Sequence, residues 1–140
     1  MHNAILKTFL SLIAALVMFG CATQVDPGTG SGRPEVLIKG TTASKVQGVL
    51  TNEVINMGYA PRSRSDVRAV FDRRQDFRIT KRMAFELIEI DGSVRVIGTL
   101  HDIVNIGTRE EYTVSVHNNV DERKPLMDVL AKAKASLEKT

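Results

Sequence analysis

The hydrophobic positions after residue 34 recur at two periods, which predict strands and helices in a mixed order. Residues 35–39 are a short apolar run closed by Gly40, and residues 66–72 alternate apolar with polar residues, so each segment is a predicted strand. Apolar residues at helical spacing lie between them: Val46, Val49, Leu50, Val54 and Met57. The order therefore begins with strand, helix and strand, and residues 59–65 are an expected connection.

The ends of this first helix carry signals of their own. Residues 41–44 supply N-cap candidates, and Ser44 with Gln47 three residues later fits a capping box. Gly58 stands where a residue in the left-handed conformation commonly ends a helix. The prediction is an amphipathic helix of about four turns.

The dipeptide Asp91-Gly92 predicts a two-residue hairpin turn between strands at 83–90 and 93–105. Pairing Ile90 with Ser93 sets a register in which six apolar side chains share one face: Met83, Phe85, Leu87, Val94, Val96 and Leu100. A slip of one residue would scatter them over both faces, so the turn and the apolar pattern agree on this register.

Two further elements complete the pattern. Residues 106–111 are a predicted turn, after which an antiparallel strand places three more residues on the same face: Tyr112, Val114 and Val116. A last helix is expected to begin near Asp121, with Pro125 in its first turn and apolar residues at helical spacing: Leu126, Val129, Leu130, Ala133 and Leu137. The sequence predicts an α+β fold, a two-layer sandwich of a five-stranded antiparallel sheet with two helices on one face, ordered β-α-β-β-β-β-α.

The first 21 residues follow a different pattern. Lys7 is the only formal side-chain charge among them, the stretch from Phe9 to Phe19 is almost entirely apolar, and Gly20 precedes the only cysteine. A charged start, an apolar centre and a small residue before a cut are typical of a secretory signal peptide. The segment Met18-Phe19-Gly20-Cys21 resembles the lipobox of bacterial lipoproteins. That resemblance implies cleavage after residue 20 and a lipid such as palmitate on Cys21.

Two alternatives to a lipid anchor fit these residues less well. An uncleaved transmembrane helix needs about 20 apolar residues. The apolar stretch that begins after Lys7 is shorter, because it covers only residues 8–21. A secreted protein with a free thiol would leave Cys21 without a disulfide partner, whereas lipidation uses that thiol. In the enteric lipoproteins that this segment resembles, Asp after the cysteine retains the protein in the inner membrane. Ala22 stands there, which implies the outer membrane, facing the periplasm.

Composition separates the rest of the chain into two parts. Residues 21–34 are rich in Thr, Gly, Ser and Pro and are an expected flexible, lipidated tether, whereas residues 35–140 are long enough for a single α+β domain. The chain has 43% hydrophobic and 25% charged residues, as in an ordinary globular domain. Loss of Lys7 with residues 1–20 lowers the formal net charge from +3 to +2, which does not indicate a nucleic-acid partner.

The order of elements over residues 35–140 resembles the helix-grip and TBP-like layouts of small periplasmic lipoprotein domains. These include the repeated domains of the BamC-type component of the outer-membrane assembly machine. The resemblance covers element order alone, so it assigns no functional residues, and a shared fold does not establish a shared function.

Two histidines are a candidate metal site. The predicted register places His101 and His117 nearly opposite each other on the face away from the core, with Asp102 next in sequence. Strand alternation directs Asp102 to the other face, which leaves two ligands where zinc needs three or four. The favoured interpretation is two solvent-facing strand histidines, with no metal and no cofactor.

Residues 62–82 form a basic segment in which only Asp66, Asp72 and Asp76 oppose the cations. Its candidate anion-binding residues are Arg62, Arg64, Arg68, Arg73, Arg74, Arg78 and Arg82, with Lys81 among them. Such a segment could meet lipid headgroups, anionic polysaccharide or an acidic partner. The alternative is a solvated loop and edge strand whose charges prevent aggregation.

The outer face of the predicted sheet mixes apolar and polar residues. Its apolar members are Ala84, Ile88, Ile90, Ile97 and Ile103. An open antiparallel face is ordinarily polar, so the four isoleucines are candidate contacts for a partner or a second copy. The alternative is that β-branched residues fill strand positions because they favour strands.

The sequence offers no set of catalytic groups. Cys21 is assigned to lipid, no G-x-S-x-G motif occurs, and the glycines at 28, 30 and 32 precede no helix start. We therefore expect a binding protein rather than an enzyme. The prediction is a lipid-anchored periplasmic module, an accessory or assembly component of a cell-envelope complex, with an envelope protein or a second copy as partner. The runner-up is a binder of anionic lipid or glycan through the basic segment.

Overall fold

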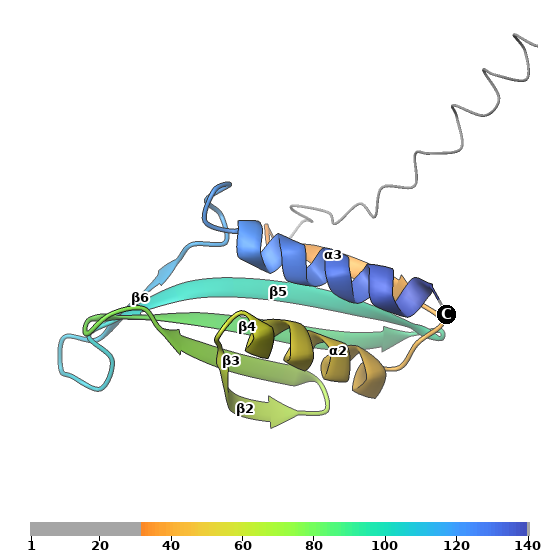
Figure 1. Ribbon diagram of the computed structural model, residues 1–140, viewed down its shortest axis with the longest axis horizontal. Helices are drawn as coiled ribbons and strands as arrows, with labels where there is room; N and C mark the ends of the chain where they lie inside the picture. The colour runs from red at the N-terminus through yellow and green to blue at the C-terminus, as the bar shows by residue number, and fades with distance from the viewer. Residues whose placement is uncertain (1–31, 140) are drawn as a thin grey trace, which may run out of the picture.

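The computed structural model describes residues 32–139, which form one antiparallel sheet with two helices on one of its faces (Figure 1). In this part of the chain the helices are α2 (Ala43–Asn56) and α3 (Lys124–Glu138). The strands are β1 (Glu35–Lys39), β2 (Ala60–Ser65), β3 (Arg68–Arg74), β4 (Ile79–Ile90), β5 (Ser93–Val104) and β6 (Tyr112–Ser115). The α+β class and the placement of both helices on one face are confirmed, whereas the predicted count of five strands is wrong.

The sheet is organised around the long β4–β5 hairpin. The strand order is β1-β5-β4-β3-β2, and β6 also pairs with β5. The predicted register is confirmed, since Ile90 lies opposite Ser93 and Met83 lies opposite Leu100. Asp91 and Gly92 both have positive φ, 47° and 74°, as a two-residue turn of this kind requires. All six side chains that this register places on the inner face are buried in the core.

Two short strands share one edge of β5. The strand β1 pairs with residues 93–97 of β5, and β6 pairs with residues 101–104. Where they meet, Pro34 O accepts a hydrogen bond from Gly98 N at 2.8 Å, and Leu100 O accepts from Val116 N at 3.0 Å. The edge of β5 is therefore covered almost continuously by two separate segments of the chain.

The additional strand is β2, in the segment that we expected to be a connection. Its six residues are all exposed, so no apolar alternation marks it in the sequence. It is held by backbone pairing with β3, with a bulge between Pro61 and Ser63, and an edge strand tolerates proline. The predicted strand at 66–72 begins instead at Arg68, and Val67, in the turn, is 63% exposed.

The first helix begins at one of its four N-cap candidates. Thr42 is the N-cap residue, and its side chain accepts from Lys45 N at 3.5 Å. The predicted capping box is wrong, because Gln47 is buried and bonded elsewhere. Gly58 does follow the helix with φ of 84°, and Pro125 lies in the first turn of α3. The last helix starts at Lys124 rather than near Asp121.

The core lies between the helices and the inner face of the sheet. A Cβ atom at Gly98 would lie 2.6 Å from Leu126 Cδ1, so α3 approaches β5 as closely as a glycine allows. Val116 is buried as expected, but Tyr112 and Val114 are 56% and 44% exposed. They lie on the predicted face, opposite Val104 and Asp102. They stay exposed because this end of the sheet extends beyond both helices (Figure 1).

The predicted signal peptide, Cys21 and most of the tether lie outside the described residues. Within residues 32–139, neither helix combines the length and apolar character that crossing a bilayer requires.

Candidate functional site

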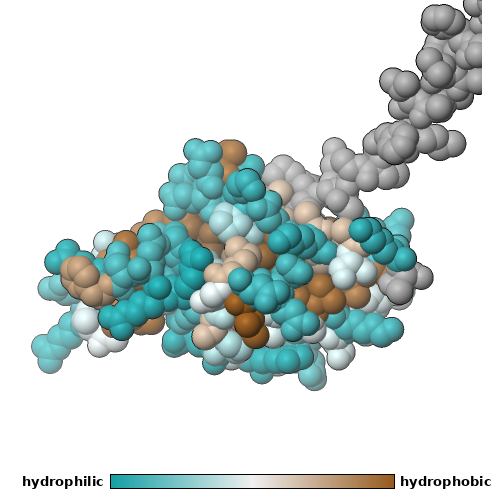
Figure 2. Space-filling model, viewed as in Figure 1, coloured by the Kyte–Doolittle hydropathy of each residue, from teal (hydrophilic) through white to brown (hydrophobic). Residues whose placement is uncertain are grey.

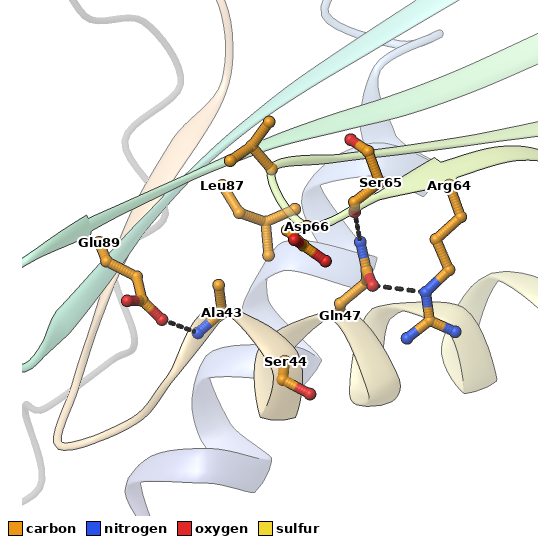
Figure 3. A pocket seen from close by; sticks show the side chains of 9 residues that line it. Ala43, Ser44, Gln47, Arg64, Ser65, Asp66, Leu87 and Glu89 are labelled. Atoms are coloured by element: carbon orange, nitrogen blue, oxygen red, sulfur yellow. Dashed lines mark hydrogen bonds between the residues drawn. The ribbon is translucent and has the colours of Figure 1, made fainter.

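A groove of about 660 Å³ lies at the start of α2, beside the β2–β3 turn and the last residues of β4 (Figure 3). Helix α2 contributes Ala43, Ser44 and Gln47, the turn region contributes Arg64, Ser65, Asp66 and Val67, and β4 contributes Leu87 and Glu89. The groove therefore forms only when three separate segments meet.

Gln47 fixes the β2–β3 turn against the helix. Its side-chain Nε2 donates to Ser65 O at 2.6 Å, and its Oε1 accepts from Arg64 Nε at 2.5 Å (Figure 3). The residue is only 4% exposed. A buried amide must be hydrogen-bonded to avoid a desolvation cost, and both of its polar atoms are. Gln47 thus has a structural role, because it joins α2 to the β2–β3 turn at one wall of the groove.

Glu89 holds the helix start against the sheet. Its Oε1 accepts from Ala43 N at 2.6 Å, which satisfies one of the free amide groups at the amino end of α2 (Figure 3). By contrast, the side chains of Asp66 and Ser44 make no hydrogen bond within residues 32–139. The groove therefore offers a carboxylate and a hydroxyl to a visiting group.

The edge of β4 that borders this groove is unpaired. The strand β3 begins at Arg68, opposite Glu86, while β4 runs on to Ile90. The last backbone bond across this edge is from Leu87 N to Val67 O, at 2.9 Å. Strand alternation turns the Glu89 N–H and C=O to the same side. In the described part of the chain no strand pairs with them there.

A second hollow of about 460 Å³ lies along the same edge. It is lined by Val67, Arg68, Glu86, Leu87, Ile88 and Glu89, and so shares Val67, Leu87 and Glu89 with the groove. Ile88 and Glu86 alternate with the core residue Leu87, which assigns them to the outer face of the sheet. The unpaired edge thus has one hollow on its helix side and another on its outer side.

The four isoleucines predicted to bind a partner are not equally accessible. Ile88 and Ile90 are 42% and 45% exposed, but Ile97 and Ile103 are only 4% and 1% exposed. Expecting all four on an open surface was therefore wrong for Ile97 and Ile103. Ala84, on the same face, is also buried.

Ile97 is surrounded by charged side chains. Its cross-strand neighbours are Glu35 and Glu86. Arg33 bonds to Glu86 at 3.2 Å, and because β5 lies between β1 and β4 this contact crosses β5. The aliphatic part of an arginine shields apolar surface while its charged end stays paired. Ile103 lies between two threonines, Thr80 and Thr113.

Other ion pairs extend over the outer face. Arg95 binds Glu35 through two contacts of 3.1 and 2.5 Å, and Arg82 binds Asp72 through two contacts of 2.8 and 2.9 Å. Arg62 adds a third contact to Asp72 at 3.2 Å. Burial raises the pKa of Asp72, but the hydrogen bond and charge of Arg82, aided by Arg62, outweigh it and lower the pKa below its usual value.

The basic segment does not form one surface. Arg62, Arg68 and Arg82 lie on the outer face or its edge, Arg64 and Arg73 lie near α2, and Arg74 and Arg78 lie at the β3–β4 turn. Arg73 stacks on the Tyr59 ring at 4.9 Å and donates to Met57 O, and Lys81 pairs with Asp102 at 2.9 Å. Most of the predicted anion-binding residues therefore make internal contacts.

The two histidines are neighbours, as predicted, but they differ in exposure. Their ring centroids lie 5.3 Å apart, edge to face. His117 is only 7% exposed, so describing both as solvent-facing was wrong. Its Nδ1 lies 3.4 Å from Leu100 N and 3.2 Å from Leu100 O, in the gap where β1 and β6 meet. The His117 ring therefore lies against the backbone edge of β5.

His101 contacts a hydroxyl group. Its Nδ1 lies 3.2 Å from Ser115 Oγ. Burial lowers the pKa of His101, and the nearby His117, Arg82 and Arg68 lower it further. A catalytic serine–histidine pair also needs a carboxylate to orient the imidazole, and among residues 32–139 no carboxylate bonds to His101. Those residues likewise contain no group of three or more potential metal ligands among His, Cys, Asp and Glu.

Sequence reasoning missed Gln47 and Glu89 as the residues that build the groove. A signal for Gln47 was present, because it lies three and seven residues before the core residues Leu50 and Val54. A polar residue on a buried helical stripe needs a bonding partner. The partners, Ser65 and Arg64, come from a strand that no apolar pattern marks. No protein-family model matches the sequence, and the comparison with curated proteins gives no significant match.

Proposed function

We propose that this protein is a lipid-anchored binding module, an accessory or assembly component of a cell-envelope protein complex, held through Cys21 at the periplasmic side of the outer membrane. The anchor rests on the sequence from Met18 to Cys21, which lies outside the described residues. The binding role rests on the surface at the end of the β4–β5 hairpin.

That surface exposes three aliphatic side chains on the outer face. Leu37, Ile88 and Ile90 are 43%, 42% and 45% exposed, and Leu37 and Ile88 both flank Arg95. Val67, at the neighbouring edge, is 63% exposed. On the helix side, hydrophilic residues predominate and apolar ones occupy small areas (Figure 2). Clustered exposed aliphatic residues favour a contact surface for another protein.

The anchor and the surface can be tested together in intact cells. A photo-crosslinking amino acid in place of Ile90 should give protein adducts, whereas the same group in place of the exposed Asp121 should give few. Both variants should incorporate labelled palmitate, and Cys21→Ser should abolish labelling and the Ile90 adducts. Equal adducts at both positions would contradict the proposed surface. Unchanged processing of the Cys21→Ser variant would contradict the anchor.

A second candidate function, binding of anionic lipid or glycan, is favoured by one feature. At the β3–β4 turn Phe77 is 77% exposed, and the Arg78 guanidinium lies 5.0 Å from the centre of its ring. Arg74 and Arg78 are both exposed beside it. An exposed aromatic ring flanked by cations suits the headgroup region of an anionic membrane.

Charge reversal at this turn separates the two functions. The double variant Arg74→Glu and Arg78→Glu should lose sedimentation with phosphatidylglycerol vesicles or with purified sacculi if the turn binds anions. Arg73 is a poorer choice, because its contacts with Tyr59 and Met57 are structural. If binding to vesicles and sacculi is unchanged, anion binding at the turn is excluded.

A further inference from the structure

We propose that the unpaired end of β4 is a docking site for an extended segment of a partner protein, which adds to the sheet as a short strand beside Glu89. The inference rests on the proposed function, because it assigns a location and a binding mode to the protein contact. Adding a peptide strand to an exposed sheet edge is a common mode of recognition.

The backbone supplies the first argument. The Glu89 N–H and C=O point away from β5, on the side where β3 has already ended at Arg68. Within residues 32–139 the nearest bond on that side is the one from Leu87 N to Val67 O. A strand from a partner would extend this ladder of backbone hydrogen bonds beyond the end of β3. Its backbone would supply the acceptor for the Glu89 N–H and the donor for the Glu89 C=O.

The two hollows supply the second argument. Side chains of a strand alternate between the two faces of a sheet. A strand added here would therefore direct one side chain to the outer hollow, beside Ile88, and its neighbours to the groove beside Leu87 and Glu89. The volumes of about 460 and 660 Å³ accommodate such side chains. An unpaired edge with space on both of its faces fits a peptide strand better than it fits a small molecule.

The lining residues define the chemistry of the segment. The outer hollow lies between Val67 and Ile88, 63% and 42% exposed, which suits an aliphatic or aromatic side chain. In the groove the Asp66 carboxylate makes no bond within residues 32–139, whereas Arg64 is already bonded to Gln47. This arrangement suits a polar or basic side chain. The segment should thus alternate apolar residues with polar or basic ones.

A second copy of the chain is a poorer occupant. A symmetric pairing of two β4 edges would place the two Glu89 side chains opposite or diagonal to each other. Like charges at such positions are destabilising. Each Glu89 carboxylate already accepts from Ala43 N, so it cannot move away without releasing the helix start.

The test compares two variants of one residue in the full chain, purified in detergent micelles. Glu89→Ala removes the carboxylate that binds Ala43 but keeps the backbone N–H, whereas Glu89→Pro removes both. Because Ile88 and Ile90 make the bonds to β5, proline at position 89 leaves the hairpin ladder intact. Any difference in binding between the two variants therefore reports the contribution of the backbone N–H at position 89.

A random heptapeptide library displayed on phage is the probe. Selected peptides should alternate apolar with polar or basic residues and should compete for binding with one another. Their affinity should fall by at least about tenfold in Glu89→Pro relative to Glu89→Ala. Hydrogen exchange at the Glu89 amide should be fast in the free protein and slowed by a selected peptide, while both variants keep similar melting temperatures.

Three results would overturn the inference: no enriched peptide with alternating residues, an equal loss of affinity in the two variants, or a dimer of the free chain that Glu89→Pro dissociates. The last would make a second copy the occupant. If peptide selection fails while the photo-crosslinker at Ile90 still captures protein neighbours, the binding function stands and only the docking mode is wrong.

Discussion

The two faces of the sheet bury aliphatic side chains by different means. On the inner face Leu100 is 1% exposed and lies in the core that includes helix residues such as Leu126. On the outer face Ile97 is 4% exposed although no helix covers it in the described part of the chain. Charged side chains lie around it instead, including the pair Arg33–Glu86, which crosses β5. Shielding by helices is apolar, whereas shielding by ion pairs depends on charge, so the two faces should respond differently to mutation and pH.

The largest effect is expected at the centre of the inner face. Leu100→Ala should lower the free energy of unfolding by about 2–5 kcal/mol, because it leaves a cavity among fully buried neighbours. Leu37→Ala on the outer face, where the side chain is 43% exposed, should change it by no more than about 0.5 kcal/mol. Urea unfolding of the two variants measures the difference. Similar losses would show that the faces are equivalent in packing.

A smaller loss is expected from crowding the same face. Gly98→Ala would bring a methyl group to within 2.6 Å of Leu126 Cδ1, so α3 or the leucine must shift. We expect a loss of about 1–3 kcal/mol in urea unfolding. The double variant Gly98→Ala with Leu126→Ala should recover part of it, because the clashing atoms are gone. A loss that the double variant does not relieve would exclude close packing as the cause.

On the outer face, Asp72 should contribute a modest, pH-dependent stability. Its pKa is lowered in the folded state, so its contribution is present above the unfolded pKa of about 4 and is lost as pH falls through the lowered value. Asp72→Asn should cost no more than about 1 kcal/mol at neutral pH. Below about pH 4 the wild type should lose stability more steeply than Asp72→Asn. The exposed Asp121→Asn is the control and should follow the wild type.

The smallest effect is expected at His101. Its pKa is lowered in the folded state by burial and by His117, Arg82 and Arg68, so the folded protein binds this proton less well than the unfolded chain does. Stability from this residue should be complete above the ordinary pKa of about 6.5 and should fall as pH drops toward the lowered value. The test compares the melting temperatures of wild type and His101→Gln at pH 7.5 and 5.5. The wild type should lose more stability than the variant between these two pH values. A His101 NMR titration midpoint above the ordinary value would contradict it.

Sequence patterns predicted the elements correctly where local signals agreed with the pattern of burial. The turn at Asp91-Gly92 and the alternation on both sides of it predicted the β4–β5 register correctly, since a slip would expose the core side chains. The helical spacing from Val46 to Val54 likewise predicted α2, and that from Leu126 to Leu137 predicted α3. These elements each bury one apolar side, and that side is visible as a period in the sequence.

The candidate site could not be predicted in the same way. Its walls come from the start of α2, the β2–β3 turn and the end of β4, which are distant in sequence. The strand β2 is wholly exposed and leaves no apolar pattern. The register of β3 against β4 determines that pairing stops at Arg68 and leaves Glu89 open. Strand alternation identified Ile88 and Ile97 as outer-face residues, but it did not show which of them is covered.

The sequence by itself determined the α+β class, the hairpin register and most of the core, because these follow from periodic burial and turn chemistry within short segments. Only the tertiary structure decided that Arg33 reaches Glu86 across β5, that Gln47 holds the β2–β3 turn against α2, and that one edge of β4 is left unpaired. Those features depend on distances between segments far apart in the chain. Sequence periodicity carries no information about such distances.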